Sequence, residues 1–320
     1  MFGEINAQMT KRPDVMTIRE PSTACMMIDS RDRPNSFSTT ADNFSINSSQ
    51  SMMPGYFHRI GVQEVCLQWA VPNIGKFTNG RSSIFDNTSF EVELTNSSGT
   101  SYIVAVPSGQ YTISQLLDQL VLLLNTASGG KSFSITTDSI VGAYLTCTSN
   151  YAVLPTILGY QLGMVYPSPT YTKNHFPGEF QPPNISTFAY VDITSPELTY
   201  SQDVKDSTTS QTKHDVLFRW YFSNDNYNTT DTYGFPVFPT YRPFNMRRNI
   251  AFPKQIKWFP IQQMGNLTFT AYATIADQTI TPTTYTPFSG TVARLSTDTY
   301  SPASAPSFFE YQLTLLLSEN

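Results

Sequence analysis

The stretch MIDSRDR at residues 27–33, followed by Phe37 and by NFSI at residues 43–46, is the most informative part of this chain. It lies in a leader, residues 1–57, that is rich in serine, threonine and asparagine and is interrupted by prolines. A segment of this composition buries too little apolar surface to form a core of its own. We therefore expect an extended N-terminal arm that acts by docking on another surface.

Beyond the arm, short runs of alternating apolar and polar residues predict β-strands. The clearest runs are residues 59–71, 90–94, 102–106, 216–222, 267–274 and 309–315. The run at 216–222 is apolar on both faces, which is typical of a central strand or of one whose second face meets a neighbour. Many short strands with long polar connections predict an all-β, antiparallel sandwich.

One helix interrupts this pattern. Thr112 and Gln115 have the spacing of a capping box, in which each residue's side chain bonds the other's backbone amide. Isoleucine and leucine then recur at helical spacing over residues 113–124. Such a stripe more often faces a core than a partner, so we expect a core helix.

These features resemble the single jelly-roll penton (vertex) and minor capsid proteins of virophages, polinton-like viruses and nucleocytoplasmic large DNA viruses. The motif Asp29-Ser30-Arg31-Asp32-Arg33 with Phe37 is similar to the N-terminal arm of that family. A second point of similarity is the order Pro-x-Gly-x-Tyr-Thr at 107–112, a leucine-rich helix, and Leu-Gly-aromatic at 158–160.

The resemblance implies a single jelly-roll antiparallel β-sandwich with one inserted helix, preceded by an extended arm at 1–57. We place the jelly-roll domain at 58–320, with room for an inserted outer lobe at about 196–254. It also implies a homopentamer at the vertex of an icosahedral double-stranded DNA virus or virophage. Its neighbours would be double jelly-roll major capsid capsomers and minor capsid proteins. The protein would be assembled in the cytoplasm of the infected host and would reside in the virion.

Within this interpretation the arm tethers the vertex to the surrounding shell, through charged groups and apolar anchors. The residues assigned to this tether are Asp29, Ser30, Arg31, Asp32, Arg33, Phe37, Phe44 and Ile46. Deletion of residues 1–46 is then expected to leave the sandwich folded.

A second set of residues lies in the long aromatic segment 223–253. Tyrosine, phenylalanine and arginine are enriched at subunit interfaces, although aromatic loops also stack on sugars. The candidate interface residues are Tyr233, Phe235, Phe238, Tyr241, Arg247 and Arg248.

The chemistry of the chain offers little support for an enzyme. The net charge is −5, which does not suit a nucleic-acid-binding domain. The three cysteines lack the spacing of a zinc site, and none of the three histidines forms part of a catalytic motif. His175, in a proline-rich loop, is expected at the surface. We therefore expect no catalytic residues, no cofactor, no metal, no specific nucleic acid and no membrane span.

Two further interpretations remain open. A minor or cement capsid protein would share the arm without forming a five-fold ring. A host-recognition or glycan-binding jelly-roll spike would bind sugars through its aromatic loops and form a trimer or a monomer.

Overall fold

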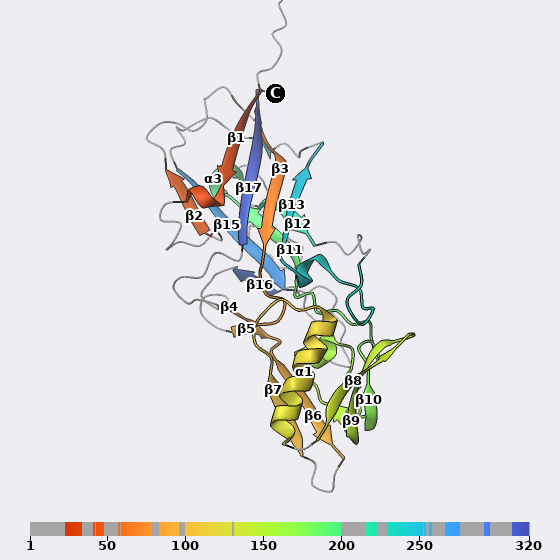
Figure 1. The fold of residues 1–320 in the computed structure, drawn as a ribbon. Coiled ribbons are helices and arrows are strands. Elements are labelled where there is room, and N and C mark those ends of the chain that lie inside the picture. Colours follow the sequence, from red (N-terminus) through yellow and green to blue (C-terminus); the bar gives the residue numbers. More distant parts are fainter. Residues whose placement is uncertain are drawn as a thin grey trace, which may run out of the picture.

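The computed structural model describes residues 23–33, 41, 43–47, 57, 59–78, 83–95, 100–129, 131–199, 216–222, 229–251, 253, 256–257, 266–275, 291–294 and 309–319. Most of its regular elements are strands (Figure 1). In chain order they are β1 (Thr23–Asp29), η1 (Ser30–Asp32), β2 (Asn43–Asn47), β3 (Arg59–Trp69), β4 (Lys76–Thr78), β5 (Ser83–Asp86), β6 (Ser89–Leu94), β7 (Ser101–Ala105), α1 (Ile113–Ser128), β8 (Phe133–Asp138), β9 (Gly142–Val153), α2 (Ile157–Gln161), β10 (Thr172–His175), β11 (Phe188–Thr194), α3 (Pro196–Thr199), β12 (Val216–Tyr221), η2 (Pro239–Tyr241), β13 (Phe244–Asn249), β14 (Ile256–Lys257), β15 (Asn266–Ile275), β16 (Thr291–Arg294) and β17 (Phe309–Ser318).

Eight of these strands pair as one long hairpin that is rolled up. The outermost pair is β1 with β17, followed inward by β2 with β15, β3 with β13, and β11 with β12, all antiparallel. Strand β17 also pairs with β3, and β15 with β11, which joins these pairs into two sheets. The first sheet has the order β1-β17-β3-β13, and the second contains β12-β11-β15 with β2 beside β15. This pairing is that of a jelly roll, so the predicted fold class is confirmed.

The interior of the sandwich is built from alternate side chains of its strands. On β17, Phe309, Tyr311, Leu313, Leu315 and Leu317 are all buried, as the alternation in the sequence predicts. They meet buried residues of the second sheet, including those of β15 and β11. Each such side chain contributes about 1.5–3 kcal/mol relative to an exposed position. The two sheets are therefore held together mainly by apolar burial.

Two segments of the predicted N-terminal arm, residues 1–57, are strands of the sandwich. Residues 23–29 and 43–47 form β1 and β2, which pair within the chain's own two sheets. Ile28 and Phe44 are buried in the sandwich core, where the Phe44 ring lies 5.5 Å from that of Phe269. Strand β1 was hidden in the sequence because its solvent face carries Cys25 and Met27, which blurs the alternation.

A second lobe is inserted between β3 and β11. Figure 1 shows α1 and strands β6 to β10 gathered beyond one end of the sandwich. Its sheet has the order β10-β9-β6-β7, with β8 beside β9, and its apolar core is separate from that of the sandwich. The predicted insertion at about 196–254 is thus misplaced: β12 and β13 belong to the sandwich, and residues 229–241 pack on the lobe.

A buried polar network fastens the lobe to the sandwich. The side-chain amide of Asn87 donates to the backbone oxygen of Asn73 at 2.9 Å and to Oε1 of Gln161 at 2.8 Å. Its side-chain oxygen accepts from the amide of Gly75 at 2.7 Å. Asn87 is fully buried, so each bond lost would leave a polar group without water. The Thr187 hydroxyl, just before β11, donates to the same backbone oxygen of Asn73, so the network holds the segments that lead into and out of the lobe.

The predicted helix and its capping box are confirmed in α1. Oγ1 of Thr112 accepts from the amide of Gln115 at 3.3 Å, and Oε1 of Gln115 accepts from the amide of Thr112 at 3.0 Å. The leucine stripe faces the lobe core, with Leu116, Leu117 and Leu120 fully buried. Of the two interpretations of residues 216–222, the central strand is wrong, because β12 lies at the edge of the second sheet among the described strands. The other, a strand whose second face meets a neighbour, stays a prediction.

The capping box gives a first testable prediction. Thr112→Ala removes the bond that satisfies the amide of Gln115, and should lower the free energy of unfolding by about 1 kcal/mol. Thr126→Ala is the matched control, because Thr126 is exposed near the other end of the same helix. Chemical denaturation of both variants measures the difference, and equal stabilities would contradict the assigned cap.

Because β1 and β2 pair within the sandwich, deletion of residues 1–46 is no longer expected to leave the sandwich folded. Removing residues 1–22 leaves every described strand intact, and this variant should unfold cooperatively like the full chain. Removing residues 1–46 takes away β1 and most of β2, which uncovers apolar core in both sheets. That variant should lose its cooperative transition in circular dichroism melts. A cooperative, soluble 47–320 fragment would show that the two strands are dispensable.

Candidate functional site

The motif at residues 29–33 forms the turn that leaves β1. Oδ1 of Asp29 accepts from the amide of Arg31 at 2.9 Å and caps the short helix η1. The guanidinium of Arg31 in turn donates to both carboxylate oxygens of Asp29, at 3.0 Å from Nε and 2.6 Å from Nη2. This hydrogen bond lowers the pKa of Asp29 and raises that of Arg31. The Arg31 side chain remains 58% exposed.

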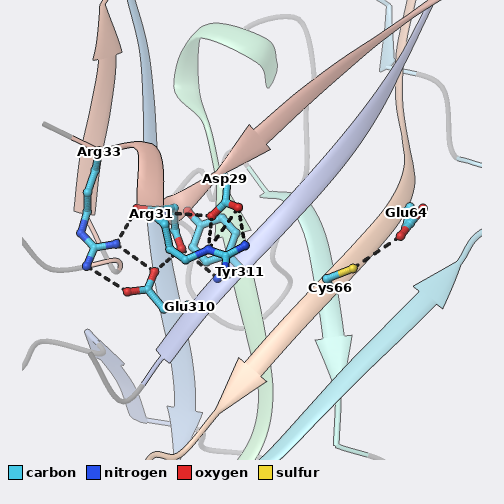
Figure 2. Close-up of polar contacts among 8 residues, drawn as sticks. Asp29, Arg31, Arg33, Glu64, Cys66, Glu310 and Tyr311 are labelled. Carbon is cyan, nitrogen blue, oxygen red and sulfur yellow. Dashed lines mark hydrogen bonds and ion pairs between the residues drawn. The ribbon is translucent and has the colours of Figure 1, made fainter. Parts of the chain in front are cut away.

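Arg33 has the opposite environment, because its side chain is only 3% exposed. It forms a two-pronged ion pair with Glu310 at the start of β17, at 2.8 Å and 2.9 Å (Figure 2). The hydroxyl of Ser30 donates to the same carboxylate and accepts from the amide of Tyr311 at 2.9 Å. The turn is thereby fastened to the last strand of the fold.

The predicted tether residues therefore have different environments. Ser30 and Arg33 bond within the chain, Phe44 is a core residue, and Ile46 packs against that core. Arg31 and Asp32 are exposed. Phe37 lies outside the described residues. That this motif tethers the chain to a neighbour stays a prediction. Arg31 and Asp32 are the residues of the motif that are exposed and could make such a contact.

A second charged pair lies on the outer face of the first sheet. Nη2 of Arg247 on β13 donates to Oε2 of Glu64 on β3 at 2.9 Å, which lowers the pKa of Glu64. The thiol of Cys66 donates to Oε1 of Glu64 at 3.4 Å, and Figure 2 shows this contact along β3. Burial raises the pKa of the Cys66 thiol, so it is not an activated thiolate.

Four of the predicted interface residues lie in the lobe instead. Phe235 and Tyr241 are 6% and 1% exposed, and the hydroxyl of Tyr241 accepts from the amide of Ile185 at 2.9 Å. Phe238 is partly buried and its ring lies 5.0 Å from that of Tyr241. Side chains as buried within one chain as those of Phe235 and Tyr241 are not available to another subunit, so the prediction is wrong for these two residues. For the partly buried Tyr233 and Phe238 it stays a prediction.

Tyr233 and its neighbours fasten the 229–241 segment to α1. The Tyr233 hydroxyl donates to Asp118 on the helix at 2.7 Å, which raises the pKa of Tyr233 to about 12. Oδ2 of Asp231 accepts from the amide of Ser114 at 2.8 Å, and Oδ1 accepts from the amide of Phe235 at 2.9 Å. Asp231 was missed in the sequence, since Ser114, the partner that ties it to α1, lies 117 residues away.

His175 is buried and not at the surface as expected. It is 1% exposed, and its Nε2 donates to the backbone oxygen of Tyr151 at 3.0 Å. Its Nδ1 lies 2.8 Å from a carboxylate oxygen of Glu179. The histidine thus joins β10 and the loop after it to β9, which is a structural role in the lobe.

The outer face of the second sheet carries an arginine that the sequence did not single out. Arg219 on β12 donates to both carboxylate oxygens of Asp192 on β11, at 2.6 Å and 2.7 Å. Its guanidinium also lies 4.0 Å from the ring centre of Tyr190. These contacts raise the pKa of Arg219, with the Asp192 hydrogen bond as the main cause. The pair stabilises an edge strand.

The described residues contain no group of three or more histidine, cysteine, aspartate or glutamate side chains placed to bind a metal ion. None of the helices in the described part of the chain is long and apolar enough to cross a membrane.

Comparison with known proteins gives structural neighbours but no sequence family. No family model matches the chain. No curated protein matches it either. The mavirus penton protein is similar with a TM-score of 0.48 and 10% identity, over 92% of this chain and 98% of that one. A chain of the Sputnik virophage cryo-EM structure is similar with a TM-score of 0.48 and 12% identity, over 94% and 98% of the two chains.

The buried ion pair of the motif gives a second prediction. Arg33→Ala leaves the Glu310 carboxylate without its partner in a mostly buried site, and should lower the free energy of unfolding by about 3–5 kcal/mol. Arg31→Ala removes an exposed arginine two residues away and should cost about 1 kcal/mol or less. Denaturant titration of both variants gives the comparison. Equal losses would contradict the structural role assigned to Arg33.

Proposed function

We propose that this chain is a structural capsid protein that forms the pentameric vertex of an icosahedral double-stranded DNA virus or virophage. The observation that carries the proposal is the pairing of eight strands in the jelly-roll order, in a single sandwich with one inserted lobe. Jelly rolls are a fold of viral capsid domains, although lectins and cupins share it. The motif at residues 29–33, which resembles that of vertex proteins, supports the capsid interpretation.

The low content of charged residues supports the proposal that neighbouring subunits cover much of this protein's surface. Charged residues make up 13% of the chain, about half the usual share of about 25% in soluble domains. A weakly charged surface suits a protein whose working state is a packed shell. The role that follows is geometric rather than enzymatic, because neither the sequence nor the described residues bring a catalytic set together.

In this role five copies form a closed ring by heterologous contacts, in which one side of each subunit meets a different side of the next. Exposed Arg31 of the 29–33 motif, with the segment before β1, would contact the double jelly-roll capsomers and minor capsid proteins around the vertex. The protein would work in the virion after assembly in the host cytoplasm. A minor capsid protein would use the same fold without the ring.

Light scattering of the purified chain tests the ring directly. The expected mass is five times the 35.8 kDa of one chain. A trimer would favour the host-recognition spike. A monomer at every concentration would contradict a ring that this chain forms by itself, and would favour the minor capsid role.

A further inference from the structure

Among the described strands, β13 forms the edge of the first sheet that lies opposite β1. Its register places Met246 opposite Leu67 and Arg248 opposite Val65 on β3. Residues directly opposite in an antiparallel pair point to the same face of the sheet. Leu67 and Val65 are buried in the sandwich core, so Met246 and Arg248 point toward the interior side as well.

Both side chains are nevertheless exposed. Met246 is 42% exposed, and Arg248 is exposed at the next inward position. The face that these two residues form is called the open seam below. Methionine and arginine are among the residues enriched at subunit interfaces. An inward-facing pair that is exposed in this way is an apolar and basic surface that a partner would complete.

The charges near the seam define what kind of partner fits. Arg248 is exposed on the seam itself, whereas Arg247 points to the outer face of the sheet and is paired there with Glu64. The charge that the seam presents is therefore the positive charge of Arg248. A partner for this edge should present carboxylates.

The opposite edge of the same sheet has such a surface. Figure 1 shows β1 and β13 at opposite sides of the first sheet, and the strand order β1-β17-β3-β13 agrees. At the β1 edge, Asp29 is paired with Arg31 and Glu310 with Arg33. Asp32 adds a further exposed carboxylate, so the balance of these five residues is negative.

We propose that the open seam binds the β1–η1 edge of a second copy of this chain, with Arg248 facing Asp32 across the interface. A closed ring requires two different and complementary surfaces on each subunit, and the two edges of the first sheet have opposite charge. Burial of Met246 supplies apolar contact, and the arginine–carboxylate pair selects the orientation. This inference rests on the proposed function, since it names the surfaces through which the ring closes.

Charge exchange between the two edges tests the interface. Arg248→Glu and Asp32→Arg should each reduce the mass measured by light scattering from the pentamer to the single chain. The double variant Arg248→Glu/Asp32→Arg should recover the pentamer, because it restores an opposite-charge pair in reverse. Lys173→Glu makes the same charge change at an exposed position of β10 in the lobe, and should leave the pentamer intact.

The outcomes separate this inference from the proposed function. Melting curves like that of the wild type confirm that the single variants fold, as expected for substitutions of exposed side chains. Pentameric single variants beside a pentameric wild type would overturn the interface and leave the vertex role standing. A double variant that stays monomeric would overturn the pairing of Arg248 with Asp32. A wild type that never forms a pentamer would overturn both proposals.

Discussion

The position of β17 between β1 and β3 is the constraint on which the rest of the structure depends. This strand pairs along most of its length with both neighbours, although it comes from the opposite end of the chain. Its inward residues contribute a full row of the sandwich core. The Arg33–Glu310 pair then fastens the turn after β1 to the beginning of β17. Strand β17 thereby joins β1 to β3 and β13 in one sheet.

The part of the fold that the sequence predicted is the part with a local signal. The alternation at 309–315 and 267–274 predicted β17 and β15, and the pair Thr112 and Gln115 predicted where α1 begins. Each of these signals lies within a few neighbouring residues. The strands and the capped helix were therefore readable without knowledge of the fold.

The features that were missed depend on partners far away in the chain. Strand β1 has apolar residues on both faces, and only its pairing with β17 identifies it as part of the sandwich. His175 is buried, and its two ring nitrogens lie within hydrogen-bond distance of the Tyr151 backbone oxygen and the Glu179 carboxylate. The proline-rich sequence around it gave no indication of these contacts. The aromatic residues of 229–241 belong to an intrachain core for the same reason. Their aromatic composition indicated that these side chains would be covered. The fold shows that the lobe of the same chain covers them.

A vertex protein occupies the five-fold axes of its particle. The lobe lies beyond one end of the sandwich, and β1 and β13 form the two edges of the first sheet among the described strands (Figure 1). The most direct test is an image reconstruction of purified particles that contain this protein. The account predicts density for the sandwich and its lobe, in five copies, around the five-fold axes. Density for this chain at other positions of the shell, with a different protein at the five-fold axes, would contradict it.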